Sequence, residues 1–441
     1  MCFPAARDDV TLRSVEFLEH PLRRELVREM HLRRFAPVAA PASLVQMVSL
    51  VEEELREAET TRLTELARTH GGTFDPEARH AMIALNENLT FLWERHTEAT
   101  TLTVISHEGQ SSGFEEASKW LLDWPGVVVR ATKIFVERDA KRARKLLPEM
   151  EFETEDLVCC AVNAGVTIWS DFRIRDDGFG RLLLTAGDAR PGELGRIIQR
   201  LQELGNYRNL ALLGLPEVRR LMPELSALEA RLAEESAQLG EDNRRGDDQL
   251  LSDLSLLSAE LARIRVASGY RLSASGAYAQ IAMDRLESLC VRPHEGYQDL
   301  TEFTERRLVP GMRTCESFVE RLRRLSERSG DAIALLNTRI DTRIKAQNLD
   351  LLRSMESSFN LQLRLQNLVE ALSVIAASYY FIGLVAYVLK GAAAFPDGDR
   401  IDLALAIATP IVVLAMYLLV GQIRKRVIGE TEGAAKSSSK D

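Results

Sequence analysis

The sequence predicts an α/β or α+β domain, then a long helical region, then a C-terminal hairpin of two transmembrane helices. Three observations support this fold class. Stretches in which apolar and polar residues alternate, as they do in half-buried strands, occur before about residue 210. After residue 216 the apolar residues recur every three or four positions, which is the helical period. Near the C-terminus, Ala371–Leu389 and Leu403–Val420 carry no charge and are each long enough to cross a bilayer.

Length and charge narrow the class of protein. The chain has 441 residues, which is too long for one ordinary domain. Its net charge of −9 argues against a general nucleic-acid binder, because such a protein needs a basic face to replace phosphate counterions. The N-terminus has no apolar stretch of signal-peptide length, so we expect the bulk of the chain in the cytoplasm.

The first elements are expected to be helical. Pro21 suits the first turn of a helix that reaches about Leu32. After an interruption by prolines, Ser43 is a suitable N-cap for a second helix that begins at Leu44.

Strands are expected next. Leu89, Phe91 and Trp93 alternate with polar neighbours, and the segment from Thr101 to Ile105 does the same. Residues 126–137 predict a further strand, and residues 157–186 about three more, with a hairpin turn at 176–178. Helical patterns at 113–122 and 191–204 separate these strands. We therefore expect a sheet of five to seven strands.

The last helix is expected to run without a break into the first membrane span. At 1.5 Å per residue, a helix from Arg313 to Leu389 would be more than ~100 Å long and would need packing partners. We therefore expect a homo-oligomer. The expected parts are a cytoplasmic α/β domain (1–215), a helical stalk (216–370), two spans (371–389 and 403–420, within 371–420) and a basic, then disordered cytoplasmic tail (421–441).

Basic residues near the spans predict the orientation. Arg353 and Arg364 precede the first span and residues 424–426 follow the second, whereas the linker carries Lys390 and Arg400. Because basic residues favour the cytoplasmic side, both termini are expected in the cytoplasm.

Five scattered cysteines predict reduced thiols. Their number is odd and their spacing repeats nothing. Cys159 and Cys160 are adjacent and would point to opposite faces of a strand, so they are poor partners for a disulfide.

No constellation of catalytic residues is evident, so we expect neither an enzyme nor a bound cofactor. His96 and Glu98, in "WERHTE", share a strand face and are weak candidates for metal ligands; hydrogen-bonded structural side chains are the alternative. A second cluster near the N-terminus has the composition of an anion or lipid contact, or of a solvated charged face. It comprises Arg23, Arg24, Arg28, Arg33 and Arg34.

One face of the first span is polar. The residues recur at three or four positions, as helical neighbours do. Such a face is typical of a seam against another helix, or of an ion path in an oligomer with a cation as its passenger. It comprises Asn367, Glu370, Ser373, Ala377 and Tyr380.

Five blocks of sequence resemble the bacterial membrane-anchored proteins of the family named domain of unknown function 3422 (DUF3422). They are "EHPLRRELVREMHLRRF", "WERHTE", "YRNLALLGLPEVRRLMPEL", "RTCESF" and "LQLRLQNLVEALSVIAASYYFIGLVAYVLKG". The resemblance runs from about Glu16 to Arg426 and implies a bacterial inner-membrane location, but no activity. The family's first block tends to read His-Ala-Arg-Pro-Phe, whereas residues 31–35 here read His-Leu-Arg-Arg-Phe.

The layout also resembles the CorA family of magnesium channels. The shared features are a cytoplasmic α/β domain, a long stalk helix and two C-terminal spans. The Gly-Met-Asn signature of that family is missing, since residues 387–391 read Tyr-Val-Leu-Lys-Gly. The first hypothesis is therefore a CorA-like ion channel or transporter. The alternative is a membrane-tethered scaffold or sensor whose cytoplasmic domain binds a protein or ligand.

Overall fold

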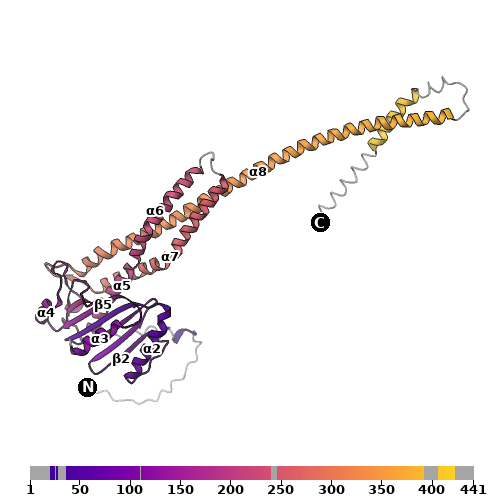
Figure 1. Cartoon of the computed structure of the whole chain (residues 1–441). Coiled ribbons are helices and arrows are strands. Elements are labelled where there is room, and N and C mark those ends of the chain that lie inside the picture. Colours follow the sequence, from indigo (N-terminus) through magenta and orange to yellow (C-terminus); the bar gives the residue numbers. More distant parts are fainter. Residues whose placement is uncertain are drawn as a thin grey trace, which may run out of the picture. The chain divides into compact units, whose positions relative to one another are not determined.

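The structure is a computed structural model in which the chain forms two compact units, residues 1–333 and residues 334–441 (Figure 1). The first unit contains an α/β domain and several long helices, and the second contains the end of one long helix and a short C-terminal helix. The described residues are 20–24, 26–27, 36–109, 111–239, 246–391 and 406–422.

A mixed sheet of nine strands forms the first unit's centre, two more than the largest number expected from the sequence. The strand order is β2-β3-β4-β1-β5-β8-β7-β6-β9, and β5 and β8 are its one parallel pair among the described strands. Apart from β1, the strands that the sequence did not predict are too short to show an alternation of apolar and polar residues; β9 has only two residues. The bounds are β1 (Ala42–Leu50), β2 (His80–Ala84), β3 (Leu89–Arg95), β4 (Ala99–Ser106), β5 (Val127–Glu137), β6 (Val158–Ala161), β7 (Thr167–Ser170), β8 (Gly180–Thr185) and β9 (Arg292–Pro293).

Helices cover both faces of the sheet. The α2, α3 and α4 helices contribute buried side chains to the core on one face, and α5 covers the other face. Long helices follow α5, and three short 3₁₀ turns connect the strands. The bounds are α2 (Glu53–Thr69), α3 (Ser112–Leu122), α4 (Ala140–Leu146), η1 (Leu147–Met150), η2 (Thr154–Asp156), η3 (Asn163–Gly165), α5 (Pro191–Leu212), α6 (Gly214–Gln238), α7 (Asp247–Ser288) and α8 (Leu300–Gly391).

The prediction of a helix beginning at Leu44 is wrong. Residues 42–50 form β1, which pairs with β4 on one side and β5 on the other. Both faces of β1 are buried, so its sequence lacks the alternation of a half-buried strand. The alternation in β3 was informative because the Leu89, Phe91 and Trp93 side chains are buried and their neighbours are only half-buried.

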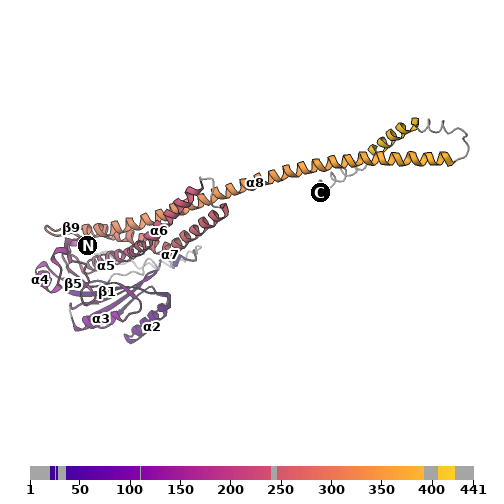
Figure 2. The ribbon, with the colours of Figure 1, turned by 45° about the horizontal axis from the view of Figure 1, so that its top comes forward.

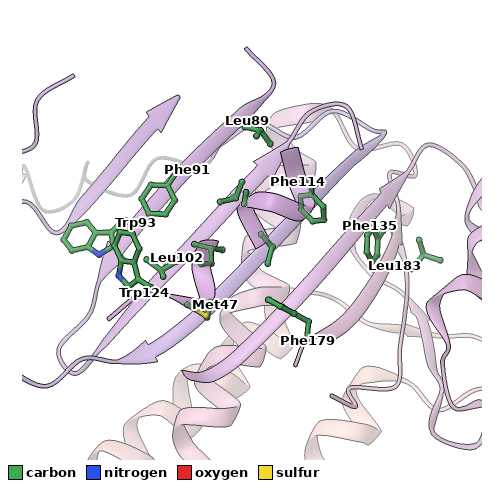
Figure 3. Packing of buried hydrophobic residues seen from close by; sticks show 14 of the residues in the cluster. Met47, Leu89, Phe91, Trp93, Leu102, Phe114, Trp124, Phe135, Phe179 and Leu183 are labelled. Carbon is green, nitrogen blue, oxygen red and sulfur yellow. The ribbon is translucent and has the colours of Figure 1, made fainter. Parts of the chain in front are cut away.

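The α2–α4 face holds the aromatic core (Figure 3). It also holds one buried carboxylate. Glu59 of α2 is fully buried, and its Oε1 accepts hydrogen bonds from the indole N–H groups of Trp93 and Trp124 at 3.1 and 3.2 Å. Its Oε2 lies 3.7 Å from guanidinium nitrogens of Arg56 and Arg95. The charge of this carboxylate is thus balanced by arginines of its own chain, although Oε2 accepts no hydrogen bond from the described residues.

The α6, α7 and α8 helices lie side by side in the first unit (Figure 1, Figure 2). Leucines at the helical period bury one stripe of α6 and one of α7. Ion pairs join their surfaces, such as Arg321 of α8 with Glu229 of α6 at 2.6 Å. Pro310 lies inside α8 without interrupting it. The helical region expected after residue 216 is confirmed in these residues.

The second unit consists of the end of α8 and the helix Ala406–Gln422, which lies beside it (Figure 2). Among the described residues, one helix, Leu300–Val388, contains a window long and apolar enough to cross a membrane by length and composition. That window has a mean hydropathy of 1.8, and 11% of it is buried. Ala406–Gln422 is apolar but shorter, and residues 403–405 of the second expected span lie outside the described residues.

Candidate ligand-binding site

A chain of polar side chains runs between the sheet and α5. Arg130 of β5 donates from its Nη1 to Gln202 Oε1 at 2.7 Å and to Asn206 Oδ1 at 2.8 Å. Asn206 in turn donates to Gln46 Oε1 at 3.0 Å, and Gln46 donates to Thr103 Oγ1 at 3.1 Å. Burying an amide or hydroxyl is costly unless it is hydrogen-bonded, and these bonds offset most of that cost; of these side-chain groups, Gln202 Nε2 alone has no partner among the described residues.

Gly205 makes room for the guanidinium of Arg130. A Cβ built at this position of α5 would lie 2.7 Å from the Cζ and Nε atoms of Arg130. Any larger residue would therefore displace the arginine from its hydrogen bonds to Gln202 and Asn206. Gly205 and Arg130 lie far apart in the sequence. The space left by the missing side chain of Gly205 is occupied by the Arg130 guanidinium.

Two cavities border this polar chain. The first has a volume of about 100 Å³ and lies between α5 and strands β1, β3 and β4; Gln46, Thr103, Asn206 and Tyr207 are among its lining residues. The second has a volume of about 80 Å³ and lies between α5 and strands β5, β7 and β8, with Leu300 of α8 in its wall. Both are therefore closed on one side by the same helix, α5.

Three arginines line the second cavity: Arg130, Arg181 and Arg208. Arg181 forms an ion pair with Glu151 at 3.0 Å. Arg208 of α5 is only 8% exposed, and its Nη1 has no hydrogen-bond acceptor among the described residues. Its guanidinium lies over the rings of Phe172 and Phe303, 4.7 and 5.1 Å from their centroids. These rings are attractive to a cation but do not neutralise it.

Burial makes both cations costly. Burial, and then the like charge of Arg208, lower the pKa of Arg130 to about 9. Burial, and then the charge of Arg307, lower the pKa of Arg208 to about 10. No carboxylate of the described residues forms an ion pair with either guanidinium to offset this cost.

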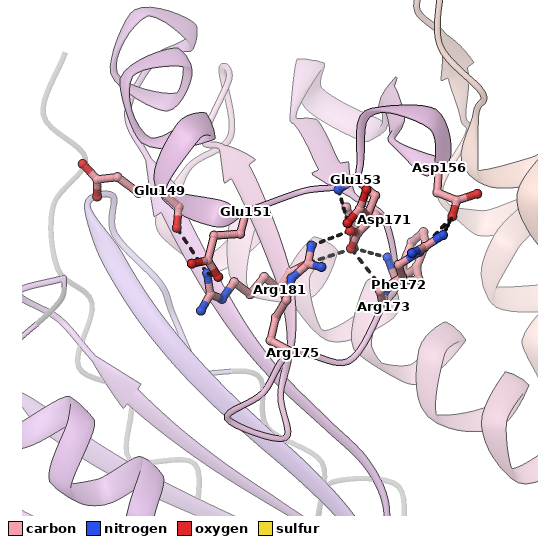
Figure 4. Close-up of polar contacts among 10 residues, drawn as sticks. Glu149, Glu151, Glu153, Asp156, Asp171, Phe172, Arg173, Arg175 and Arg181 are labelled. Atoms are coloured by element: carbon pink, nitrogen blue, oxygen red, sulfur yellow. Dashed lines mark hydrogen bonds and ion pairs between the residues drawn. The ribbon is translucent and has the colours of Figure 1, made fainter.

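Asp171 holds the backbone on both sides of its own position through hydrogen bonds (Figure 4). This buried carboxylate accepts a charge-assisted bond from Arg175 and accepts the backbone N–H groups of Glu153 and Arg173 at 3.0 and 3.2 Å. Phe172, between them, has a φ of 54°, a left-handed conformation that is unfavourable for an aromatic residue. The strain places the Phe172 ring 4.5 Å from that of Phe303, in the first turn of α8.

The expected metal ligands have other partners. His96 follows the end of β3, and its Nε2 lies 3.0 Å from Thr101 Oγ1. Both oxygens of Glu98 accept from the guanidinium of Arg271 in α7, at 2.9 and 2.7 Å. In the part of the chain that the structure describes, no group of three His, Cys, Asp or Glu side chains is arranged to hold a metal ion.

The N-terminal arginines are mostly outside the described residues. Arg23 and Arg24 lie in a short exposed helical turn, and both have an interaction partner. Arg28, Arg33 and Arg34 lie outside the described residues, as does the whole block of residues 31–35.

The polar face predicted for the first expected span lies next to the buried residues that α8 turns toward the helix Ala406–Gln422. Val374 and Ser378 of α8 are buried in the second unit, at 7% and 1% exposure. The predicted face is one residue away and is exposed, apart from the half-buried Glu370. Ser373 donates to the carbonyl of Val369 at 2.8 Å, and Tyr380 is 73% exposed. The other members, Asn367 and Ala377, are also exposed.

The sequence analysis did not single out Arg130 or Arg208. A usable signal exists in β5, where Arg130 shares a face with Thr132 and the fully buried Ile134. A second signal is the apolar context of Arg208 in α5, most of whose residues are buried. A charge in such a context usually has a partner, and here none was evident in the sequence.

Comparison with known proteins covers both units. The family model described as "Protein of unknown function (DUF3422)" matches residues 18–427. The chain belongs to the DUF3422 family. The resemblance carried by the five sequence blocks is thereby confirmed, and the DUF3422 match includes the α/β domain, α8 and Ala406–Gln422. A search of curated proteins found no match to this DUF3422 member.

Proposed function

We propose that this protein is a membrane-tethered sensor. Its α/β domain binds a small ligand beside α5, and its C-terminal hairpin of two spans, 371–389 and 403–420, holds it in the bacterial inner membrane with both termini in the cytoplasm. The ligand's presence is passed to the rest of the chain through α8. A homo-oligomer would supply packing partners for the exposed apolar residues of α8.

One observation carries this proposal. Leu300, the first residue of α8, lines the second cavity, and Phe303 one turn on contacts Arg208 and Phe172. The same helix continues without interruption to its apolar window. A ligand that favours one arrangement of these side chains therefore acts directly on the helix that leads to the membrane. A simple anchor or scaffold does not require that the first turn of α8 lines a cavity of the α/β domain.

Membrane fractionation tests the tether. Full-length protein is expressed, and membranes are washed with alkaline carbonate, which removes peripheral proteins. We expect the protein to remain in the pellet because two spans insert their apolar side chains in lipid. Quantitative release into the wash, in parallel with a peripheral marker, would show that the hairpin does not span the bilayer.

Hydrogen exchange tests the sensing role. The probe is the dialysable small-molecule fraction of the source cytoplasm, added to full-length protein in detergent. We expect slower exchange of amides at 300–310, with no change in α3, which lies on the opposite face of the sheet and serves as the internal control. If no fraction alters exchange at the start of α8, this domain is not a sensor that acts through that helix.

A CorA-like ion path is the second candidate. It is favoured by the exposure of Ser373, Ala377 and Tyr380, which leaves this face of α8 available to line an axis between copies of the chain. Purified protein in liposomes should then conduct a cation, and Glu370→Ala should change the flux. Identical low flux for wild type and Glu370→Ala, with all common cations, would dismiss the channel.

A further inference from the structure

We propose that the second cavity binds a small oxyanion, as a phosphoryl group or inorganic phosphate, between Arg130 and Arg208. The proposal rests on the proposed function in so far as it names the ligand class of the same site. It differs from the anion contact predicted near the N-terminus, because both arginines lie inside the α/β domain.

The first argument is charge. Of the three arginines that line the cavity, Arg181 pairs with Glu151, whereas no carboxylate of the described residues pairs with Arg130 or Arg208. The acceptors of Arg130 are the neutral side chains of Gln202 and Asn206, which hold the guanidinium in place without cancelling its charge. A bound oxyanion would supply the negative charge that the surrounding protein does not.

The second argument is the unpartnered donor. Arg208 is more than nine-tenths buried, and its Nη1 lacks an acceptor among the described residues. A buried donor without a partner is unfavourable, and a guanidinium donor more so because it is charged. Phosphate and related oxyanions present several acceptor oxygens, and the guanidinium fork matches them with two parallel hydrogen bonds.

The third argument is construction. The Phe172 and Phe303 rings cover the Arg208 guanidinium, and the Asp171 bonds hold Phe172 in a strained conformation to do so. Gly205 keeps the Arg130 guanidinium against α5. Both cations are thus fixed before any ligand arrives, which lowers the entropic cost of binding.

Size and electrostatics restrict the ligand. A cavity of about 80 Å³ accommodates a group the size of phosphate or sulfate and no large organic body. The pKa values of Arg130 and Arg208 are lowered by burial and by like charge, so an anion between them would raise both again. Binding should therefore weaken as the pH rises above about 9, where Arg130 loses its proton.

Calorimetric titration of full-length protein in detergent tests the site. The buffer contains Tris and chloride, and the titrants are inorganic phosphate, sulfate, glycerol phosphate and acetate. We expect phosphate to bind and to raise the melting temperature of the protein. Arg130→Met and Arg208→Met should each weaken phosphate binding at least tenfold. The matched control is Arg220→Met, which removes an exposed arginine of α6 that pairs with Glu217. It should leave binding unchanged.

Each outcome decides something. Tighter binding of glycerol phosphate than of phosphate identifies a phosphoryl group of a larger ligand, and the reverse identifies a free oxyanion. Phosphate binding that is the same in wild type and Arg208→Met, or no binding of any titrant, overturns the site. If Arg208→Met does not fold, Gly205→Ala replaces it, since it displaces Arg130 alone. If phosphate does not bind but the small-molecule fraction still slows hydrogen exchange at residues 300–310, the oxyanion site is wrong. The sensor proposal then stands with another ligand.

Discussion

The two faces of the sheet bury charged side chains in opposite ways. On the α2–α4 face, Glu59 is fully buried but accepts from two indoles and lies beside two arginines. On the α5 face, Arg130 and Arg208 are surrounded by amides and aromatic rings, with no paired carboxylate among the described residues.

The difference distinguishes two roles of a buried charged side chain: stabilising the fold and binding a ligand. A buried ion that its own chain neutralises contributes to specifying the fold, and removing it leaves its partners unsatisfied. A buried ion that its chain leaves without a counter-charge destabilises the empty fold, and is retained where a ligand offsets the cost. If the proposed oxyanion site exists, one face of the sheet holds its charge for stability and the other holds it for binding.

The largest expected effect is on the Glu59 face. Glu59→Met should lower the free energy of unfolding by about 3–5 kcal/mol, because it leaves two indole N–H groups without their acceptor and two nearby guanidinium groups without their counter-charge. Glu59→Gln keeps an acceptor for the indoles and should lose less. Denaturant titration of full-length protein in detergent measures both. Equal stability of wild type and Glu59→Met would remove the basis of the comparison.

Gly205→Ala should have the next largest effect. The new Cβ displaces the Arg130 guanidinium and breaks its bonds to Gln202 and Asn206, at a cost of about 1–3 kcal/mol. Gly276→Ala in α7 is the matched control, because nothing lies within 4 Å of its added Cβ. Helix propensity alone should make the control more stable, by up to about 1 kcal/mol. The same titration measures both, and changes of the same sign would contradict the packing argument.

Much of the fold was predictable because its elements have a local period. The half-buried β3, the amphipathic α3 and the long helices after residue 216 each agree with their sequence pattern. The strand β1 was wrongly predicted as a helix, since a strand buried on both faces has no period to recognise. β9 has two residues and is defined only by its partner β6.

The binding face was far less predictable. Arg130 and Arg208 become neighbours only because α5 packs across β5, and no local pattern specifies that packing. The arginines that attracted attention lie together in the sequence, where charged residues usually form a solvated surface. Clustering in sequence is thus a weaker indicator of a buried anion site than a single arginine in an apolar strand.

A smaller effect is expected for Arg208→Met on stability without phosphate. The substitution removes a buried cation and keeps an unbranched apolar side chain between Phe172 and Phe303. Because the charge has no counter-ion, the free energy of unfolding should change by less than about 1 kcal/mol or increase. The matched Glu59→Met loss is several times larger. A loss above about 2 kcal/mol from Arg208→Met would make this arginine a structural residue, like Glu59.

The smallest expected effect compares thiols on the two faces. Cys159 belongs to the Glu59 core, and burial raises its pKa to about 11. Cys160 faces the other way, opposite Ile168 of the second cavity, and burial raises its pKa to about 12 despite the arginines on that face. Both thiols are therefore protonated at neutral pH, and each thiolate fraction rises tenfold per pH unit below these values.

Alkylation of native full-length protein, followed by peptide mass spectrometry, reads this difference. At pH 8 the exposed Cys290 should be modified within minutes, while Cys159 and Cys160 should stay unmodified. As the pH is raised toward 10, Cys159 should react before Cys160, because its pKa is the less strongly raised of the two and the thiolate is the reactive form. Faster reaction of Cys160 would show that Arg130 and Arg208 stabilise its thiolate. Their effect would then not be specific to an oxyanion bound between them.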